Sequence, residues 1–447
     1  MKKSILWLVT IFMIISLSAV FMLSGCKQAA ETTAAAETTA AAETTAAAET
    51  TAAAETTAAA EPVTIKWLQW WESELGVEFL DSIQNKFIEE HPEVTIERED
   101  VPYLQYYDKL ILLTQANSLP DVMAVNTHFI PALAELKAIE SLNAKLDEEG
   151  LSDQYADFGT YLGEKYMLFI YGGGITPFVN KEMFEELGLK YPTTWEELLE
   201  VGHALTASGA NRYLTVLEIS GPDVVAYVTN QFFSQAGAKY LDENGKFIYN
   251  NEAGVKALEF IKTLYDEKLL LPGTFTNTQK IKRDAFIAKN IAMMWSGPWD
   301  VAILAGMKPD FTVECIKNPA GPAGTAGGLG GSGITMNANG KNKEIAWEFM
   351  KFLTSGTGNQ MWCETTKNLS YFKPNMDLPY VQNNQQLKVL AEQAVTPGNQ
   401  QRPIVPQVMA WADIFNAEIQ KYLNGEKTAQ QALDNSITLY EEALAKG

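Results

Sequence analysis

The stretch "PVTIKWLQWWESELGVEFLDSIQNKFIEEHPEVTIERE", residues 62–99, decides the fold. Its first part, "VTIKWLQW", alternates apolar and polar residues, which predicts a strand. Apolar residues then recur at four-residue steps from Leu75 to Phe87, and the pattern stops at Pro92, which predicts a helix. "VTIERE" predicts a second strand. Strand, helix and strand in this order predict an α/β fold with a parallel sheet.

The elements that follow extend this order. "YLQYYDKLILLTQA" predicts a second helix, and "DVMAV", ending at Val125, predicts a third strand. We expect a second lobe from about Thr176. There "YPTTWEELLEVGHAL" contains a capping box, Thr193 with Glu196, and "NNEAGVKALEFIKTLYDEKLL" predicts a helix capped at Asn250 or Asn251. A Gly-rich connector over residues 319–333, which we interpret as a loop, separates these helices from the helical pattern "KEIAWEFMKFL".

The N-terminus predicts export. Lys2 and Lys3 precede an apolar run that ends in "LSGC", Leu23 to Cys26. This pattern resembles the lipobox of bacterial lipoproteins, which implies a signal peptide over residues 1–25 and acylation of the Cys26 thiol. A plain signal peptide and an uncleaved membrane anchor are the alternatives. Five copies of ETTAAA follow, and because they offer almost nothing to pack, we expect residues 26–61 to be a disordered linker.

Charge and cysteine content narrow the function. The chain carries 34 Lys and Arg against 55 Asp and Glu, a formal net charge of −21, which disfavours nucleic acid as a partner. Besides Cys26 there are Cys315 and Cys363. A disulfide between them is an option in an exported protein, but two buried free thiols fit better.

Familiar catalytic signatures are missing from the sequence. It contains no HExxH, GxSxG or GxxxxGK[ST], and its three histidines lack metal-ligand spacing. Gly328, Gly330 and Gly333 match GxGxxG. They follow a Pro/Gly-rich segment instead of a strand, so we interpret them as part of a loop and not as a dinucleotide site. We therefore expect no catalysis, no cofactor and no metal.

Aromatic and polar side chains follow two of the predicted strands. Trp70, Trp71 and Glu72 come after the first strand, and residues 126–128, "NTH", come after the third. Because ligands bind beyond the carboxyl ends of strands in open α/β sheets, we expect these turns to meet at one edge. Indole faces and hydrogen-bonding groups together suit a sugar. Trp67 and Trp70 fit the core better than a ligand site, whereas Trp71, Glu72 and His128 fit the site better.

Eight blocks in order resemble the family 1 extracellular solute-binding proteins of bacterial ABC transporters, the group that includes maltose-binding protein. They are "TIKWLQWWESE", "LPDVMAVNTHFIPALAE", "FVNKEMFEELGL", "YPTTWEELLE", "FFSQAGAKYLDENGK", "AMMWSGPWD", "GGLGGSGITMNANGKNKEIAWEFMKFLTS" and "GEKTAQQALDNSI". The resemblance implies two α/β lobes joined by a hinge, with an interlobe cleft that closes over a ligand. We expect residues 62–172 and 326–372 to form one lobe and residues 173–325 and 373–447 the other.

The resemblance also implies the site. The residues it places in the cleft are Trp71, Glu72, Asn126, Thr127, His128, Gly173, Trp299, Ser332, Arg402 and Trp411. Two positions depart from the family. Gly172 to Gly174 stand where many members have a polar or acidic side chain, which predicts either a roomier pocket or contacts from backbone amides, and Ser332 replaces a common Trp. Arg402 could contact ligand or form a surface ion pair, and Trp295 fits the core better than the site.

The resemblance therefore implies a monomeric, lipid-anchored receptor on the extracytoplasmic face of the cell membrane, which captures a mono- or oligosaccharide and delivers it to an ABC permease. One alternative keeps the receptor but changes the ligand to a non-sugar such as a polyamine. Another is a lipid-anchored carbohydrate-active enzyme, which needs two carboxylates about 5 to 9.5 Å apart. Glu72 is the one carboxylate among the predicted site residues, so that pair is missing.

Overall fold

The computed structural model describes residues 61–155, 159–209, 211–219 and 225–446. The predictions for the signal peptide, for Cys26 and for the repeats up to residue 60 lie outside these ranges. The described residues belong to one compact unit, Ala59–Gly447. This unit contains two main sheets, and we call the part built on the larger sheet the first lobe and the part built on the smaller sheet the second lobe.

The larger sheet confirms the predicted strands and their parallel arrangement. Its strands, in spatial order, are β2 (Val94–Asp100), β1 (Val63–Gln69), β3 (Val122–Val125), β10 (Leu329–Met336) and β6 (Leu168–Gly174). β1 runs parallel to both β2 and β3, as the opening stretch predicts. β10, which joins from a later segment of the chain, is antiparallel to β3 and β6. β6 therefore runs in the same direction as the first three strands, and β10 alone runs against them.

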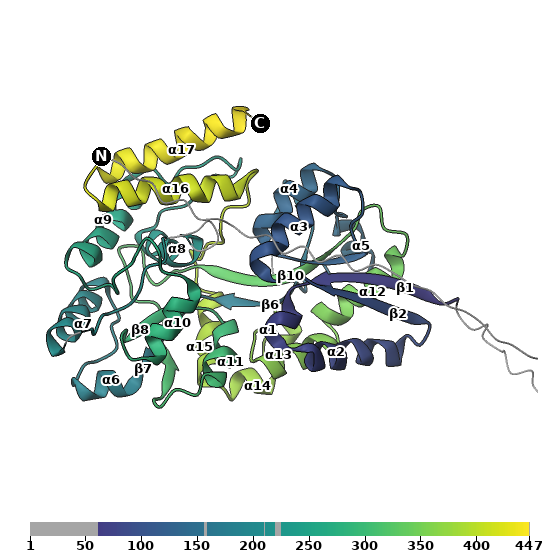
Figure 1. Ribbon diagram of the computed structural model, residues 1–447, viewed down its shortest axis with the longest axis horizontal. Helices are drawn as coiled ribbons and strands as arrows, with labels where there is room; N and C mark the ends of the chain where they lie inside the picture. The colour runs from purple at the N-terminus through teal and green to yellow at the C-terminus, as the bar shows by residue number, and fades with distance from the viewer. Residues whose placement is uncertain (1–60, 156–158, 210, 220–224, 447) are drawn as a thin grey trace, which may run out of the picture. The chain divides into compact units, whose positions relative to one another are not determined.

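Helices cover this sheet (Figure 1). They are α1 (Trp71–Leu75), α2 (Val77–Glu90), α3 (Tyr103–Gln115), η1 (Thr127–Phe129), α4 (Ile130–Glu135), α5 (Asn143–Glu148), α12 (Lys343–Thr354), α13 (Thr357–Thr366) and η2 (Lys373–Asn375), with a small hairpin of β4 (Thr160–Tyr161) and β5 (Glu164–Lys165). Aromatic pairs join helices that are far apart in sequence. Phe79 of α2 meets Trp362 of α13 at 5.3 Å between ring centroids, and Phe87 meets Phe349 of α12 at 5.0 Å. The apolar stripe read from the sequence therefore does face the core.

The smaller sheet has three antiparallel strands. Their order is β8 (Met293–Ser296), β7 (Thr176–Asn180) and β9 (Val313–Cys315). Successive residues of a strand point to opposite faces, and Phe178 and Val179 accordingly belong to two separate hydrophobic clusters. The chain enters this sheet between Gly174 and Thr176 and returns to the larger one between β9 and β10, so segments distant in sequence build each lobe. The predicted lobe boundaries stay predictions.

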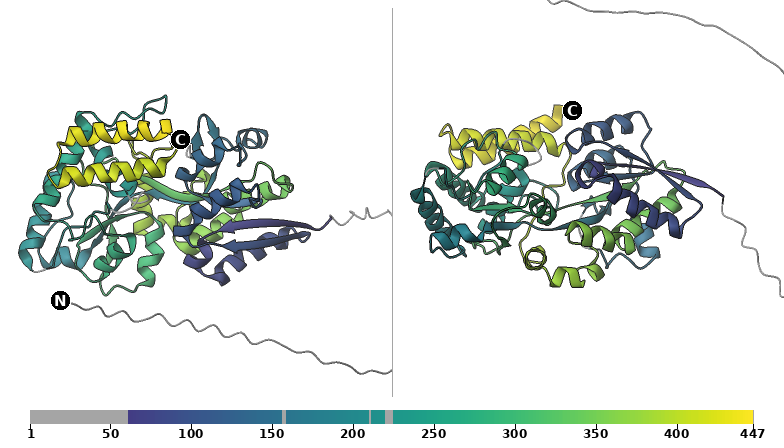
Figure 2. Two further views of the ribbon diagram at one scale, coloured as in Figure 1. Left: turned by 45° about the horizontal axis from the view of Figure 1, so that its top comes forward. Right: turned by 60° about the horizontal axis from the view of Figure 1, so that its bottom comes forward.

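Helices enclose the smaller sheet as well. They are α6 (Lys181–Glu186), α7 (Trp195–Ser208), α8 (Val225–Ala236), α9 (Glu252–Asp266), α10 (Gln279–Ile287), α11 (Trp299–Gly306), α14 (Pro379–Gln382), α15 (Gln385–Ala394), α16 (Val408–Leu423) and α17 (Ala429–Lys446). α16 and α17 lie side by side in every view (Figures 1 and 2). The Phe415 ring of α16 is 5.8 Å from that of Phe233 in α8, so these helices share one core.

Helix capping follows the prediction with one shift. α9 begins after Asn251, whose side chain accepts hydrogen bonds from two backbone N–H groups of the first turn. α7 begins one residue later than predicted. Thr194, not Thr193, is its N-cap and accepts from the Glu197 N–H, while the Glu197 carboxylate accepts from the backbone and hydroxyl of Thr193. The predicted box of Thr193 with Glu196 is therefore wrong by one position.

Two glycines of the GxGxxG match, Gly330 and Gly333, lie in a strand. β10 begins at Leu329, and a Cβ at Gly333 would lie 2.1 Å from the Leu168 carbonyl oxygen of β6. The interpretation as a loop is therefore wrong for Gly330 and Gly333, and the close approach of β6 explains the glycine at position 333. Both described cysteines, Cys315 and Cys363, are free and buried, as expected.

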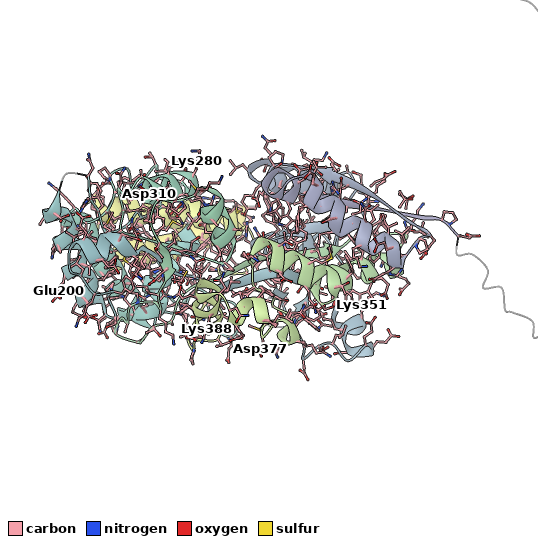
Figure 3. All side chains as sticks on the ribbon, turned by 90° about the horizontal axis from the view of Figure 1, so that it is seen from below. Glu200, Lys280, Asp310, Lys351, Asp377 and Lys388 are labelled. Carbon is pink, nitrogen blue, oxygen red and sulfur yellow. The ribbon has the colours of Figure 1, made fainter. Side chains whose placement is uncertain are left out.

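Figure 3 labels six charged side chains at the outside of the molecule. Of these, Glu200, Lys280, Asp310, Asp377 and Lys388 are exposed, and Lys351 is half-buried. Exposed pairs such as that of Lys280 with Asp284 contribute little to stability.

Candidate functional site

A cavity at the end of β3 brings together residues from five segments of the chain. It is lined by Asn126, Thr127, His128, Phe169, Leu329, Gly330, Gly331, Tyr371, Gln401 and Arg402. Its free volume is about 390 Å³, open solvent included. Asn126, Thr127 and His128 follow β3 in the first lobe. Gln401 and Arg402 follow Gln400, whose side chain is hydrogen-bonded to the second lobe. The sequence prediction named Asn126, Thr127, His128 and Arg402 among the lining residues.

Hydrogen bonds hold the turn after β3 in place. The Asn126 amide donates to the Tyr103 hydroxyl at 2.8 Å, and its carbonyl accepts from the Ser332 hydroxyl of β10 at 2.8 Å. His128 is buried, with its ring 4.3 Å from that of Phe129. β1 and β3 are parallel neighbours, so the turns that follow them do meet at one edge. Ser332 thus supports the cavity wall from behind.

Tyr371 fills the space above the glycines of β6. Its ring is so close to the strand that a Cβ at Gly172 would lie 2.1 Å from Cε2 of Tyr371. Its hydroxyl lies 3.3 Å from the carbonyl oxygens of both Gly173 and Gly330, and its ring meets Phe169 edge-on at 4.9 Å. The prediction of a roomier pocket at Gly172 to Gly174 is therefore wrong. An aromatic wall occupies that space, and Gly173 supports it through its carbonyl group.

Gln400 fixes the segment that carries Gln401 and Arg402. Its side-chain amide donates to the Ala238 carbonyl at 2.6 Å, and its side-chain carbonyl accepts from the Tyr240 N–H at 3.0 Å. Its backbone carbonyl accepts from the Leu329 N–H at 2.9 Å. Arg402 is buried. Burial of the Tyr240 hydroxyl raises its pKa, and the positive charge of Arg402 lowers that pKa in part.

Trp71 and Glu72 do not line the cavity in this conformation. Trp71 has no exposed surface, and its indole N–H donates to the Tyr171 hydroxyl at 3.0 Å. The Glu72 carboxylate is 2.7 Å from Nε of Arg98, which also pairs with Asp81. Both residues follow β1 as predicted, but aromatic packing and an ion pair occupy them. Trp67 and Trp70 are core residues, as expected.

The three other tryptophans considered from the sequence, Trp295, Trp299 and Trp411, lie in the second lobe. Trp295 is buried, and its indole N–H donates to Asn318 at 2.9 Å, so it belongs to the core as expected. Trp299 is half-buried at the first position of α11, directly after the predicted break at Gly297 and Pro298. Trp411 has no exposed surface and stacks on Phe247 and Phe415 inside the core. Neither Trp299 nor Trp411 lines the cavity.

The family model for bacterial extracellular solute-binding proteins matches residues 69–360. The chain belongs to this family. The resemblance read from the sequence blocks is thus confirmed, and membership in a family of extracellular binding proteins implies an extracytoplasmic location.

Solved structures share the two-lobed fold. An ABC transporter solute-binding protein from Thermotoga lettingae, bound with alpha-D-tagatose, is 24% identical with a TM-score of 0.74, covering 85% of this chain and 98% of that one. An ABC substrate-binding protein from Listeria monocytogenes in complex with cycloalternan is 18% identical with a TM-score of 0.74, covering 86% and 100%. At these identities the likeness shows the fold alone.

Two sequence relatives are named as arabinooligosaccharide-binding proteins. The arabinooligosaccharide-binding protein of Bacillus subtilis is 23% identical over 222 residues, which cover 45% of this solute-binding protein and 48% of the relative. A Brucella abortus protein, named provisionally as a binding protein, is 22% identical over 373 residues, 82% of this chain and 90% of its own.

Glu74 of α1 and Arg283 of α10 influence each other electrostatically from different lobes of this solute-binding protein. Glu74 is exposed, yet the protein around its carboxyl raises its pKa to about 7; the Arg283 charge lowers the pKa and Asp100 raises it. Arg283 donates to Asp300 at 2.5 Å. The Glu74 carboxyl therefore lies within electrostatic range of a charge on the second lobe.

Two further properties hold for the described residues. They contain no group of three or more His, Cys, Asp or Glu side chains that could hold a metal ion. Among the described helices, none combines the length and apolar composition that a membrane span requires.

Sequence reasoning missed several cavity residues, chiefly Tyr371 and Gln401. Tyr371 lies in "NLSYF", which has no periodic or motif signal, and reaches the cavity only because η2 and β10 bring it against β6. Gln401 lies beside Arg402, which the resemblance does mark. The signal that could have found Gln401 was therefore adjacency in sequence, whereas Tyr371 required the structure.

Proposed function

We propose that this solute-binding protein is a sugar receptor that delivers a mono- or oligosaccharide to an ABC permease. The observation that carries the proposal is the cavity itself. It is lined by the aromatic rings of Phe169 and Tyr371 together with hydrogen-bonding side chains from separate segments of the chain. Aromatic faces cover the C–H face of a sugar, and amide, imidazole and guanidinium groups bind its hydroxyls.

The charge of the cavity favours a sugar over a polyamine. A guanidinium group, that of Arg402, lines it, and the lining residues that the structure describes include no carboxylate. A cationic ligand would meet an unfavourable positive charge there. The same lining offers no pair of carboxylates for glycoside hydrolysis within the described ranges. The relatives named for tagatose, cycloalternan and arabinooligosaccharides point to the same ligand class.

Binding by lobe closure follows from the division of the site. Asn126 and His128 belong to the first lobe, while Gln400 bonds the segment of Gln401 and Arg402 both to β10 of the first lobe and to Ala238 and Tyr240 of the second. Because the site depends on contacts to both lobes, we expect their closure to complete it. The protein acts as a monomer in this proposal. The acylated Cys26 holds it at the outer face of the membrane, and the repeats set its distance from the permease.

Calorimetric titration of the detergent-solubilised protein tests the ligand class. D-tagatose, maltotriose and an arabinotriose are compared with spermidine. Saturable binding of at least one sugar, together with a smaller radius of gyration in X-ray scattering, is the expected result. Binding of spermidine alone would contradict the sugar assignment, and release of a reducing end from maltotriose would favour the enzyme.

The anchor needs a separate test. Cys26→Ala should release the protein from membranes or block its processing, while sugar affinity stays unchanged, because a lipid chain contributes about 0.8 kcal/mol per buried methylene. Membrane retention at the wild-type level would contradict acylation at Cys26.

A further inference from the structure

The side chain of Gln401 has an unused acceptor at the cavity. Gln401 lines the cavity beside Arg402, and its Oε1 is buried without a hydrogen-bond partner among the described residues. Buried polar atoms without a partner are rare in native proteins, and each calls for an explanation. A group that enters the cavity with the ligand would supply the missing donor.

The position of this acceptor is fixed by its neighbours. The backbone N–H of Gln400 donates to the Gly327 carbonyl at 3.0 Å, and the Asn230 side chain donates to the Gln400 carbonyl at 2.9 Å. Together with the side-chain bonds of Gln400 to the second lobe, these contacts fix the backbone next to Gln401. They place the Gln401 side chain at the cavity, where rotation about its own χ angles is enough to turn its amide toward a ligand.

The acceptor and a donor are adjacent. Arg402 presents a guanidinium group with five N–H donors, so it can donate to a ligand oxygen and keep another partner. Across the cavity lie the Tyr371 ring and the Asn126 turn. Two neighbouring hydroxyl groups on one sugar ring match this arrangement, because one can donate to Gln401 while the next accepts from Arg402.

We propose that Gln401 determines specificity, accepting through Oε1 a hydrogen bond from one hydroxyl of a vicinal pair on the sugar, while Arg402 donates to the other. This inference rests on the proposed function. It assigns to the ligand a vicinal diol, which a methylated or deoxygenated sugar lacks.

The test combines variants with altered sugars. Gln401→Leu removes both the acceptor and the donor of the amide, and Gln401→Glu keeps an acceptor of the same length. Gln382→Leu is the matched control, because Gln382 is exposed at the end of α14. Binding is titrated with D-tagatose, maltotriose and arabinotriose, and with the monodeoxy derivatives of each sugar that binds. Thermal melts of each variant report whether it folds.

The expected results are specific. Gln401→Leu should weaken binding about tenfold, the effect of one lost hydrogen bond, while Gln401→Glu and Gln382→Leu stay within about threefold of the wild type. The deoxy sugar that lacks the hydroxyl bound by Gln401 should bind equally well to the wild type and to Gln401→Leu. The proposal would be overturned if Gln401→Leu bound every sugar as tightly as the wild type does. It would also be overturned if Gln401→Glu lost as much affinity as Gln401→Leu. Absence of any sugar binding by the wild type would overturn the receptor assignment too.

Discussion

Two strand-to-helix turns of this protein place a tryptophan at the first helical position, and their surroundings differ. Trp71 begins α1 after β1 and has no exposed surface. Trp299 begins α11 after β8 and stays half-buried, with its ring folded over Gly297, where a Cβ would lie 2.3 Å from the indole. The local sequences are alike, but the burial is not.

The difference comes from distant segments. Tyr171 of β6 bonds the Trp71 indole, and Trp362 of α13 packs against it with ring centroids 5.0 Å apart. Trp299 is only partly buried, and it packs against the edge of the hydrophobic cluster of the second lobe. A tryptophan at an element boundary thus becomes core or surface according to what the rest of the chain lays over it.

The largest effect expected is on the buried side of this comparison. Trp71→Ala should lower the free energy of unfolding by roughly 3 to 5 kcal/mol, because it leaves a cavity among four aromatic rings. Chemical denaturation followed by circular dichroism measures this loss. If the variant unfolds at wild-type denaturant concentrations but binds sugar poorly, Trp71 is a ligand residue and the comparison fails.

The half-buried partner should behave in the opposite way. Trp299 does not line the cavity in this conformation, but it follows Pro298, whose Cγ would lie 3.2 Å from a Cβ at Gly173, so we expect lobe closure to bring its indole onto the sugar. Trp299→Ala should then weaken sugar binding by about 1 to 3 kcal/mol, the range for loss of a stacking platform judged from nucleobase stacking, or about 5- to 150-fold in dissociation constant. The sugar-dependent change in intrinsic fluorescence should shrink with it. A variant that binds as tightly as wild type but melts far lower would place Trp299 in the core.

A smaller change tests what covers Trp71. Tyr171→Phe leaves the buried indole N–H without its 3.0 Å partner, so we expect a loss of about 1 to 2 kcal/mol in the free energy of unfolding. Tyr265→Phe, at a half-buried position of α9, is the matched control. Equal stability of the two variants would mean that ring packing alone covers Trp71.

The sequence was sufficient wherever local pattern decides structure. The strand and helix of the opening stretch and the turn after β3 could be predicted, because periodicity is visible in a short stretch and two strands joined by one helix run parallel. The antiparallel entry of β10 and the Tyr371 ring could not, since both depend on segments about 200 residues away from their partners. Trp71 shows the same limit, because its cover comes from Tyr171 and Trp362.

The smallest effect concerns the charge that connects the two turns. Glu74 follows Trp71 in α1, and Arg283, which acts on it, is held by Asp300, the residue after Trp299. Because the folded-state pKa of Glu74 is raised to about 7, the folded protein binds this proton more tightly than the unfolded chain does. The resulting stability is present below the unfolded pKa of about 4.5 and is lost as the pH rises through 7.

Glu74→Gln should therefore remove this part of the pH dependence. We expect the variant to be more stable than the wild type at pH 8 by less than about 1 kcal/mol, since the exposed side chain is screened by solvent, and equal to it at pH 4. Denaturation curves at half-unit steps of pH measure the difference, with Glu78→Gln at an exposed position of α2 as the control. A difference that does not change between pH 4 and 8 would show that burial does not raise the pKa of the Glu74 carboxyl in the folded protein.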